Sequence, residues 1–208
     1  MLRRLPAQIV VTLYILVSLV NVFTEGSGFT TAAFVTVVLA MPVLIALVLV
    51  ERVRHDRLTL LVIVALFFSW LGDWLGDLLV PHVLFKIIFF FVGHVFYIMA
   101  FFPYRRSSLL HRPLPLVGYL LVIGALLAWI APRSGPLAPL VLLYGLLLVA
   151  MAVLASGLNW LTGVGSMIFV ASDLSIAVTA FALPGRIEES ELLIMSTYLV
   201  AQLMIVLG

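Results

Sequence analysis

Residues 58–80 read LTLLVIVALFFSWLGDWLGDLLV, an almost unbroken run of apolar side chains that carries two aspartates, Asp73 and Asp77. A run of about 20 apolar residues is long enough to cross the hydrocarbon core of a bilayer as an α-helix. A carboxylate inside such a helix costs at least ~2.5–3.5 kcal/mol on insertion scales, so it is usually retained for a function. This stretch therefore predicts both a membrane-spanning helix and a polar site within it.

The rest of the chain repeats the apolar part of this pattern. Of its 208 residues, 65% are hydrophobic and 10% are charged, and the mean hydropathy is +1.32. Soluble domains carry about 25% charged residues, so the composition excludes an ordinary soluble domain. We predict an all-α polytopic membrane protein in which residues 1–208 form a single domain of about eight transmembrane helices. The predicted spans are approximately 7–24, 29–50, 58–80, 83–102, 114–131, 136–156, 159–183 and 190–207.

The basic residues predict the orientation of these spans. If the N-terminus is inside, most arginines fall on the cytoplasmic side, and only Lys86, Arg133 and Arg186 fall outside. The positive-inside rule then places both termini in the cytoplasm, and we expect the bacterial cytoplasmic membrane. The N-terminal segment has the charge pattern of a signal peptide but no small-residue cleavage site, so we predict that it is the first membrane helix. The cytoplasmic arginines are Arg3, Arg4, Arg52, Arg54, Arg57, Arg105, Arg106 and Arg112.

Charge and cysteine content exclude several other classes of protein. The net charge is +2, and most of the charged residues lie in the connections between spans, which argues against a nucleic-acid partner and leaves membrane lipids as the expected surroundings. Cysteine is absent, so disulfides, thiolate metal sites and a cysteine nucleophile are excluded.

Two aspartates in different spans are predicted to share one depth. At ~1.5 Å per residue, Asp73 and Asp173 lie roughly 22 and 21 Å from the inner ends of their spans. Asp77 is one turn closer to the outer surface, which fits a solvated interfacial position or a secondary carboxylate. We therefore predict a functional site around Asp73 and Asp173.

Other polar residues within the spans come close to the same depth. His94 and Tyr97 lie in the fourth predicted span, and Tyr198 and Gln202 lie in the eighth. Each has a structural alternative, because a buried polar side chain can also serve as a hydrogen-bond partner between helices. The sequence leaves both roles open for these residues.

Four short motifs in these spans resemble the signatures of the YhhN family, the lysoplasmalogenase-like membrane hydrolases. They occur in order between residues 60 and 205, and the repeated pair Gly76-Asp77 departs from the pattern. The motifs are Ser69-Trp70-Leu71-Gly72-Asp73, Gly93-His94 with Tyr97 and Ala100-Phe101, Phe169-Val170-Ala171-Ser172-Asp173, and Tyr198 with Ala201-Gln202.

The resemblance implies an eight-helix enzyme that hydrolyses the vinyl ether bond of lysoplasmalogens. Its products would be a fatty aldehyde and a glycerophospho-choline or -ethanolamine, and no metal or organic cofactor is implied. Such a reaction needs one protonated carboxyl group and one carboxylate, which two neighbouring aspartates in an apolar site can supply. We expect Asp73 and Asp173 to be this catalytic pair.

The remaining candidates would support the pair or the substrate. His94 would bind an aspartate or the water, and Tyr97, Tyr198 and Gln202 would orient the reacting groups. Ser69 and Ser172 are candidate partners of the aspartates. The phosphate of the lysophospholipid substrate would meet Lys86, Arg133 or Arg186, although interfacial snorkelling also explains these three residues.

Two other classes of function fit the same residues. A proton-coupled transporter or lipid-translocating protein could use the carboxylates as a proton relay. A structural or regulatory membrane subunit could use the polar groups to hold its helices together. A different ether lipid also stays open as the substrate, and the sequence does not define an oligomeric state.

Overall fold

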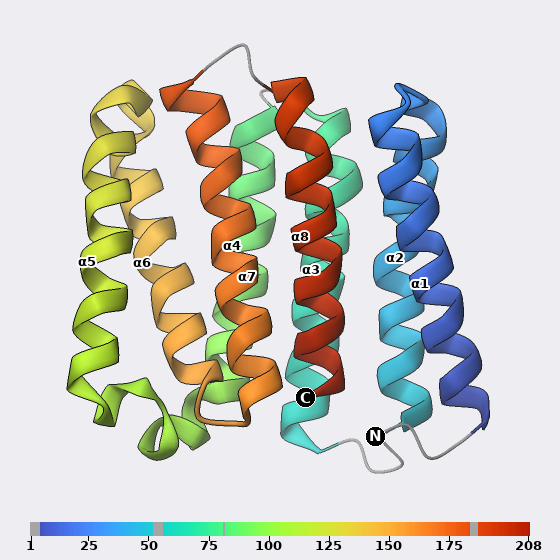
Figure 1. Ribbon diagram of the computed structural model, residues 1–208, viewed down its shortest axis with the longest axis horizontal. Helices are drawn as coiled ribbons and strands as arrows, with labels where there is room; N and C mark the ends of the chain where they lie inside the picture. The colour runs from blue at the N-terminus through green and yellow to red at the C-terminus, as the bar shows by residue number, and fades with distance from the viewer. Residues whose placement is uncertain (1–4, 52–55, 81, 184–186) are drawn as a thin grey trace. The chain divides into compact units, whose positions relative to one another are not determined.

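The computed structural model describes residues 5–51, 56–80, 82–183 and 187–208, but not the side chains of residues 77, 82–83 and 187–190. In this part of the chain all the regular structure is helical. The predicted all-α fold is thereby confirmed. The α-helices, coloured in chain order in Figure 1, are α1 (Leu5–Gly26), α2 (Thr30–Glu51), α3 (Arg57–Leu78), α4 (His82–Phe101), α5 (Pro113–Ile130), α6 (Ala138–Ala155), α7 (Trp160–Ala177) and α8 (Ile187–Leu207). Short helical segments connect or extend them, namely η1 (Phe102–Ser107), η2 (Leu109–His111), η3 (Ala131–Leu137) and the π-helix η4 (Val178–Ala182).

The described helices are suited to a membrane by length and by surface. Six stretches are long and apolar enough to cross a bilayer, and the stretch Pro113–Ala155 contains both α5 and α6. The apolar part of α8, Glu191–Leu207, is shorter. Large apolar side chains point outward, among them Leu114 at 86% exposure and Trp160 at 75%. Such a surface suits lipid and not water, so the chain is a multi-pass membrane protein.

Side-chain caps fix the starts of α3 and α7, the two helices that carry the buried aspartates. Asp56 accepts hydrogen bonds from the backbone N–H of Thr59 at 2.8 Å and from the Thr59 hydroxyl at 2.7 Å. Asn159 accepts one from the backbone N–H of Thr162 at 3.0 Å. An N-cap satisfies an N–H group that has no partner within the helix. The caps therefore fix where each helix begins, and with it the position of the aspartate along the helix.

Packing divides the chain into two units, residues 1–100 and 101–206. In the first unit α1 packs on α2, which lies beside it in Figure 1, and α2 packs on α3. The buried Asn21 joins α1 to α2, because its Nδ2 donates to the Ala33 carbonyl at 2.9 Å and to the Thr36 hydroxyl at 3.0 Å. The single domain expected over residues 1–208 stays a prediction.

A proline inside α2 is compensated by a side chain of α3. Pro42 has no N–H, so the carbonyl of Val38, four residues earlier, receives no helical hydrogen bond from it. The indole Nε1–H of Trp70 donates to this carbonyl at 2.9 Å. A carbonyl without a partner is costly in hydrocarbon. Trp70 therefore supplies the hydrogen bond that α2 lacks at Val38, and it holds α3 against α2.

Glycines allow α3 and α4 to approach closely. A Cβ on Gly72 would lie 2.8 Å from the Phe90 ring, and a Cβ on Gly93 would lie 3.1 Å from the Ala65 carbonyl oxygen and 3.6 Å from Ser69 Oγ. Small residues permit this kind of backbone contact between membrane helices. The crossing at Gly93 brings the middle of α4 against the part of α3 that leads to Asp73.

In the second unit, α7 contacts both α6 and α8. A Cβ on Gly163 would lie 2.9 Å from Ser156 Cα, at the end of α6. A Cβ on Gly165 would lie 2.7 Å from Met204 Cβ and 3.0 Å from the Ala201 carbonyl oxygen of α8. Figure 1 shows α7 and α8 side by side in orange and red. The glycines of α7 thus set how closely its two neighbours pack.

Candidate functional site

Asp73 is buried in α3, where its side chain is 7% exposed. It lies roughly 24 Å along the helix from Arg57, at ~1.5 Å per residue. Ser69, also buried, is one turn earlier and shares its face of the helix. The phenol of Tyr14 in α1 interacts electrostatically with the Asp73 carboxyl group. Tyr14 was not among the predicted site residues, and it adds a group from α1 to the two residues of α3.

His94 and Tyr97 lie on α4, beside this part of α3. His94 Nδ1 is 2.5 Å from the Phe90 carbonyl oxygen, so Nδ1 carries the proton, because a carbonyl only accepts. In the neutral ring, Nε2 is then the acceptor. The His94 and Tyr97 rings lie 6.4 Å apart between centroids, and both residues are buried. Gly93 contacts α3 near Ser69, which is one turn before Asp73. The neighbouring His94 therefore lies about one helical turn from the level of Asp73.

Asp173 is buried in α7, where its side chain is 4% exposed, and a partner from another helix holds its carboxyl group. The hydroxyl of Tyr144 in α6 donates a hydrogen bond to Asp173 Oδ2. The sequence prediction missed Tyr144. The sequence contained a signal for it, because Tyr144 carries the hydrogen-bonding side chain of a helix that is otherwise apolar. The sequence of α6 is APLVLLYGLLLVAMAVLA. A polar side chain that stands out in this way usually has a partner.

The predicted residues of α8 lie against α7. The Tyr198 and Phe169 rings meet edge to face, 5.4 Å apart between centroids. Gln202 is one turn beyond Tyr198 and is fully buried. Ser172 donates its hydroxyl to the Ile194 carbonyl of α8 at 2.9 Å. Ser172 therefore joins α7 to α8 immediately beside Asp173.

The predicted residues form two groups, one in each unit. Ser69, Asp73, His94 and Tyr97 lie in the first unit. The second unit contains Ser172, Asp173, Tyr198 and Gln202. The pairing of Asp73 with Asp173 stays a prediction. The side chain of Asp77 lies outside the described part of the chain, as do Arg186 and the arginines at 3, 4, 52 and 54 that entered the orientation argument.

Two of the basic candidates, Arg133 and Lys86, contact nearby residues of the protein itself. Arg133 Nη1 donates to the Trp129 carbonyl at the end of α5 at 2.6 Å, and its guanidinium lies 5.3 Å from the centroid of the Trp129 ring. The Lys86 side chain packs over Gly76 of α3. These contacts fit cations whose stems lie along apolar surface, and a phosphate contact for either residue stays a prediction.

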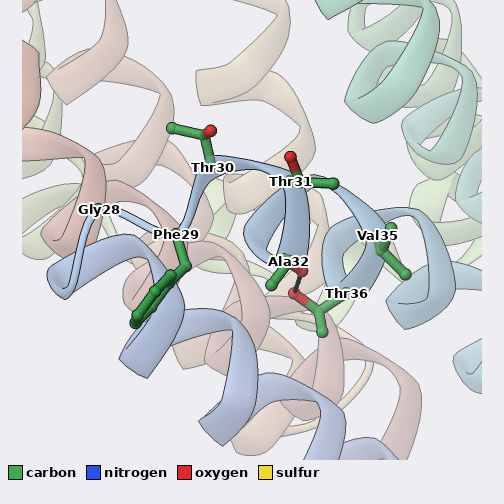
Figure 2. A pocket seen from close by; sticks show the side chains of 7 residues that line it. All are labelled: Gly28, Phe29, Thr30, Thr31, Ala32, Val35 and Thr36. Atoms are coloured by element: carbon green, nitrogen blue, oxygen red, sulfur yellow. Dashed lines mark hydrogen bonds between the residues drawn. The ribbon is translucent and has the colours of Figure 1, made fainter.

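The described part of the first unit contains an open hollow at the start of α2. Figure 2 shows its lining along the first turns of α2, with a hydrogen bond from the Thr36 hydroxyl to the Ala32 carbonyl at 2.8 Å. The hollow measures about 560 Å³ and is lined by Gly28, Phe29, Thr30, Thr31, Ala32, Val35 and Thr36. None of the predicted site residues lines it. Among the described residues, no three His, Cys, Asp or Glu side chains are grouped as metal ligands.

Comparison with known proteins identifies one relationship. The model of the YhhN family matches residues 32–208, which include every motif that suggested this resemblance. No curated protein matches the chain, and no solved structure matches it.

Proposed function

The chain belongs to the YhhN family, and from this premise we propose that it hydrolyses the vinyl ether bond of lysoplasmalogens inside the membrane. Membership of the family is consistent with a membrane hydrolase. The observation that carries the proposal is the burial of Asp73 and Asp173 in otherwise apolar helices, at 7% and 4% exposure. Carboxylates at such positions are costly and are usually retained for chemistry or transport.

Two aspartates can complete the reaction without a cofactor. The protonated aspartate gives its proton to the β-carbon of the vinyl ether, so that a C–H bond forms, the C=C π bond breaks and an oxocarbenium ion results. Water adds to the cationic carbon and gives a proton to the second aspartate. The resulting hemiacetal collapses as the second aspartate protonates the departing glycerol oxygen and the first takes the hydroxyl proton. Both aspartates regain their starting states, and fatty aldehyde and a glycerophospho head group leave.

The neighbouring residues suit supporting roles in this scheme. Tyr144 would hold one oxygen of Asp173 and leave the other for the reaction. His94 Nε2 would accept a hydrogen bond from the water, since Nδ1 is committed to Phe90. Tyr97, Tyr198 and Gln202 would orient the reacting groups, as they are buried close to the aspartates' helices.

We further propose eight membrane crossings with both termini in the cytoplasm of a bacterial cell. The stretch Pro113–Ala155 supports this count, because its 43 residues are about twice the ~20 that one crossing needs. The lysophospholipid would enter from the bilayer, with its tail along the apolar helix surfaces and its phosphate near Lys86, Arg133 or Arg186.

The deciding experiment is release of fatty aldehyde from a lysoplasmalogen by the detergent-purified protein. The Asp73→Asn variant is the protein control, and the saturated 1-alkyl lysolipid is the substrate control, because it has no π bond to protonate. Aldehyde from the wild type alone, and from the vinyl ether alone, supports the proposal. Absence of aldehyde with well-folded wild type contradicts it, and Asp73-dependent proton flux in proteoliposomes would then favour a transporter.

A further inference from the structure

The connection that leads into α5, residues 102–112, concentrates positive charge in the second unit. It contains Arg105, Arg106 and Arg112, and the side chains of Arg106 and Arg112 are exposed. Asp173 is the only acidic residue in the sequence from 101 to 187, and it is buried in α7. The next acidic residues, at 188, 189 and 191, belong to the start of α8, at the opposite end of α7. The positive charge of this connection is therefore not balanced by neighbouring carboxylates of its own unit.

The connection is fixed to the turn between α6 and α7. The backbone N–H of Leu109 donates to the Ser156 hydroxyl oxygen, at the end of α6, at 2.9 Å. A Cβ on Gly157 would lie 3.0 Å from the Cβ and the backbone nitrogen of Ser108, so the two backbones are in close contact. In Figure 1 the connection lies at the lower ends of α5 and α6. Its arginines are therefore held at the end of the unit where α5 and α7 begin.

Apolar side chains are interleaved with these arginines on the surface. Phe102 is 52% exposed, Leu110 is 48% exposed, and Leu114 in the first turn of α5 is 86% exposed. The Arg105 guanidinium lies 4.4 Å from the centroid of the Phe102 ring, and its Nη1 donates to the Phe102 carbonyl at 3.2 Å. Exposed apolar and basic side chains at the end of a membrane helix suit the boundary between acyl chains and head groups.

We propose that this basic connection, residues 102–114, binds the head groups of anionic phospholipids at the membrane surface. A guanidinium group matches the oxygens of a phosphate, and basic residues beside a membrane helix attract anionic lipids. A soluble acidic partner fits less well, because the apolar side chains between the arginines need hydrocarbon. The surface differs from the site considered for the substrate phosphate, since Arg133 lies at the other end of α5. The binding does not depend on the proposed hydrolysis.

The test is titration of the detergent-purified, full-length protein with phosphatidylglycerol, or with zwitterionic phosphatidylcholine, and native mass spectrometry of the bound lipid. We expect phosphatidylglycerol to bind more tightly. Arg106→Gln and Arg112→Gln should each weaken its binding about fivefold and leave phosphatidylcholine binding unchanged. Arg106→Lys keeps the charge and should retain most of the affinity. The matched control is Arg57→Gln, which removes one charge from an exposed arginine that follows Asp56 in sequence, and it should bind like the wild type.

Two results would overturn the proposal. One is equal affinity of the wild type for the two lipids, and the other is an equal loss of phosphatidylglycerol binding in Arg57→Gln and Arg106→Gln, which would reflect total charge. Soluble glycerol phosphate carries the same anionic group without acyl chains and should not displace the lipid; displacement at equal concentration would overturn the assignment to a lipid. Melting temperatures without added lipid should match the wild type, because the substituted side chains are exposed.

Discussion

The two units each bury one aspartate, but by different means. Near Asp73, within about one helical turn of its level, Ser69 on α3 and His94 on α4 both belong to the motifs, and Tyr14 of α1 lies outside them. Asp173 instead receives its hydrogen bond from Tyr144, 29 residues earlier in an apolar helix. A motif therefore shows where a buried carboxyl group lies, but the residue that holds it can be outside every motif.

The largest expected effect tests whether both units contribute to one reaction. Asp173→Asn and Asp73→Asn each remove a carboxyl group while keeping its shape, and each should lower the rate of aldehyde release by about 10²–10⁴-fold. Expression level and melting temperature in detergent serve as controls for folding. If Asp173→Asn keeps wild-type activity while Asp73→Asn loses it, the second unit does not take part in the chemistry.

The next effect tests the contact that the motifs did not predict. Tyr144→Phe removes the hydroxyl that holds Asp173 Oδ2 and should lower kcat by about 10–100-fold, since a misplaced catalytic group is costly. The matched control is Tyr119→Phe in α5. The Tyr119 hydroxyl is buried and has no partner among the described residues. Equal activity of the two variants would mean that Tyr144 does not position Asp173.

A stability measurement compares how tightly helices pack in the second unit. Gly165→Ala adds a Cβ that would lie 2.7 Å from Met204 Cβ, so α7 and α8 must separate. We expect a loss of about 1–3 kcal/mol, as is usual for overpacking. Gly124→Ala in α5 is the control, because its Cβ would meet nothing within 4 Å. Thermal unfolding in detergent measures both, and equal melting temperatures would argue against a close α7–α8 contact.

The smallest effect concerns the first unit. Trp70→Phe removes the donor to the Val38 carbonyl and should cost about 1 kcal/mol, or somewhat more in an apolar environment. Pro42→Ala restores an N–H that can bond to Val38 within α2. The cost of Trp70→Phe should therefore be smaller in the Pro42→Ala background, and a double-mutant cycle of melting curves measures the difference. Strict additivity would contradict the compensation.

Hydropathy alone predicted most of the fold. Helix α3 covers Arg57–Leu78 where residues 58–80 were expected, and α5 covers Pro113–Ile130 where 114–131 were expected. The reason is that a backbone in hydrocarbon has little choice except a continuous helix. The span expected at 159–183 departs from this, because it is α-helical only to Ala177 and continues as the π-helix η4. Its composition is as apolar as that of a regular helix, so hydropathy carries no signal for the change.

The sequence predicted which polar residues are buried, but not which of them are in contact. Asp73, His94 and Asp173 are buried, as their rarity in apolar helices indicated. Sequence gives the depth of a residue along its helix, whereas the direction it faces toward other helices depends on packing. Tyr14 was missed for this reason, whereas Tyr144 stood out in its apolar helix and only its partner, Asp173, depended on packing.

The bond from Trp70 to Val38 has a consequence for the order in which the chain is made. Residues 30–51 leave the ribosome before Trp70, so the newly inserted α2 holds a carbonyl that cannot yet find its partner. Until α3 arrives, this carbonyl must stay near water, a lipid head group or the insertion machinery. The assembly of α2 with α3 should therefore be complete only after Trp70 has been made, and α2 expressed with α1 alone should insert poorly.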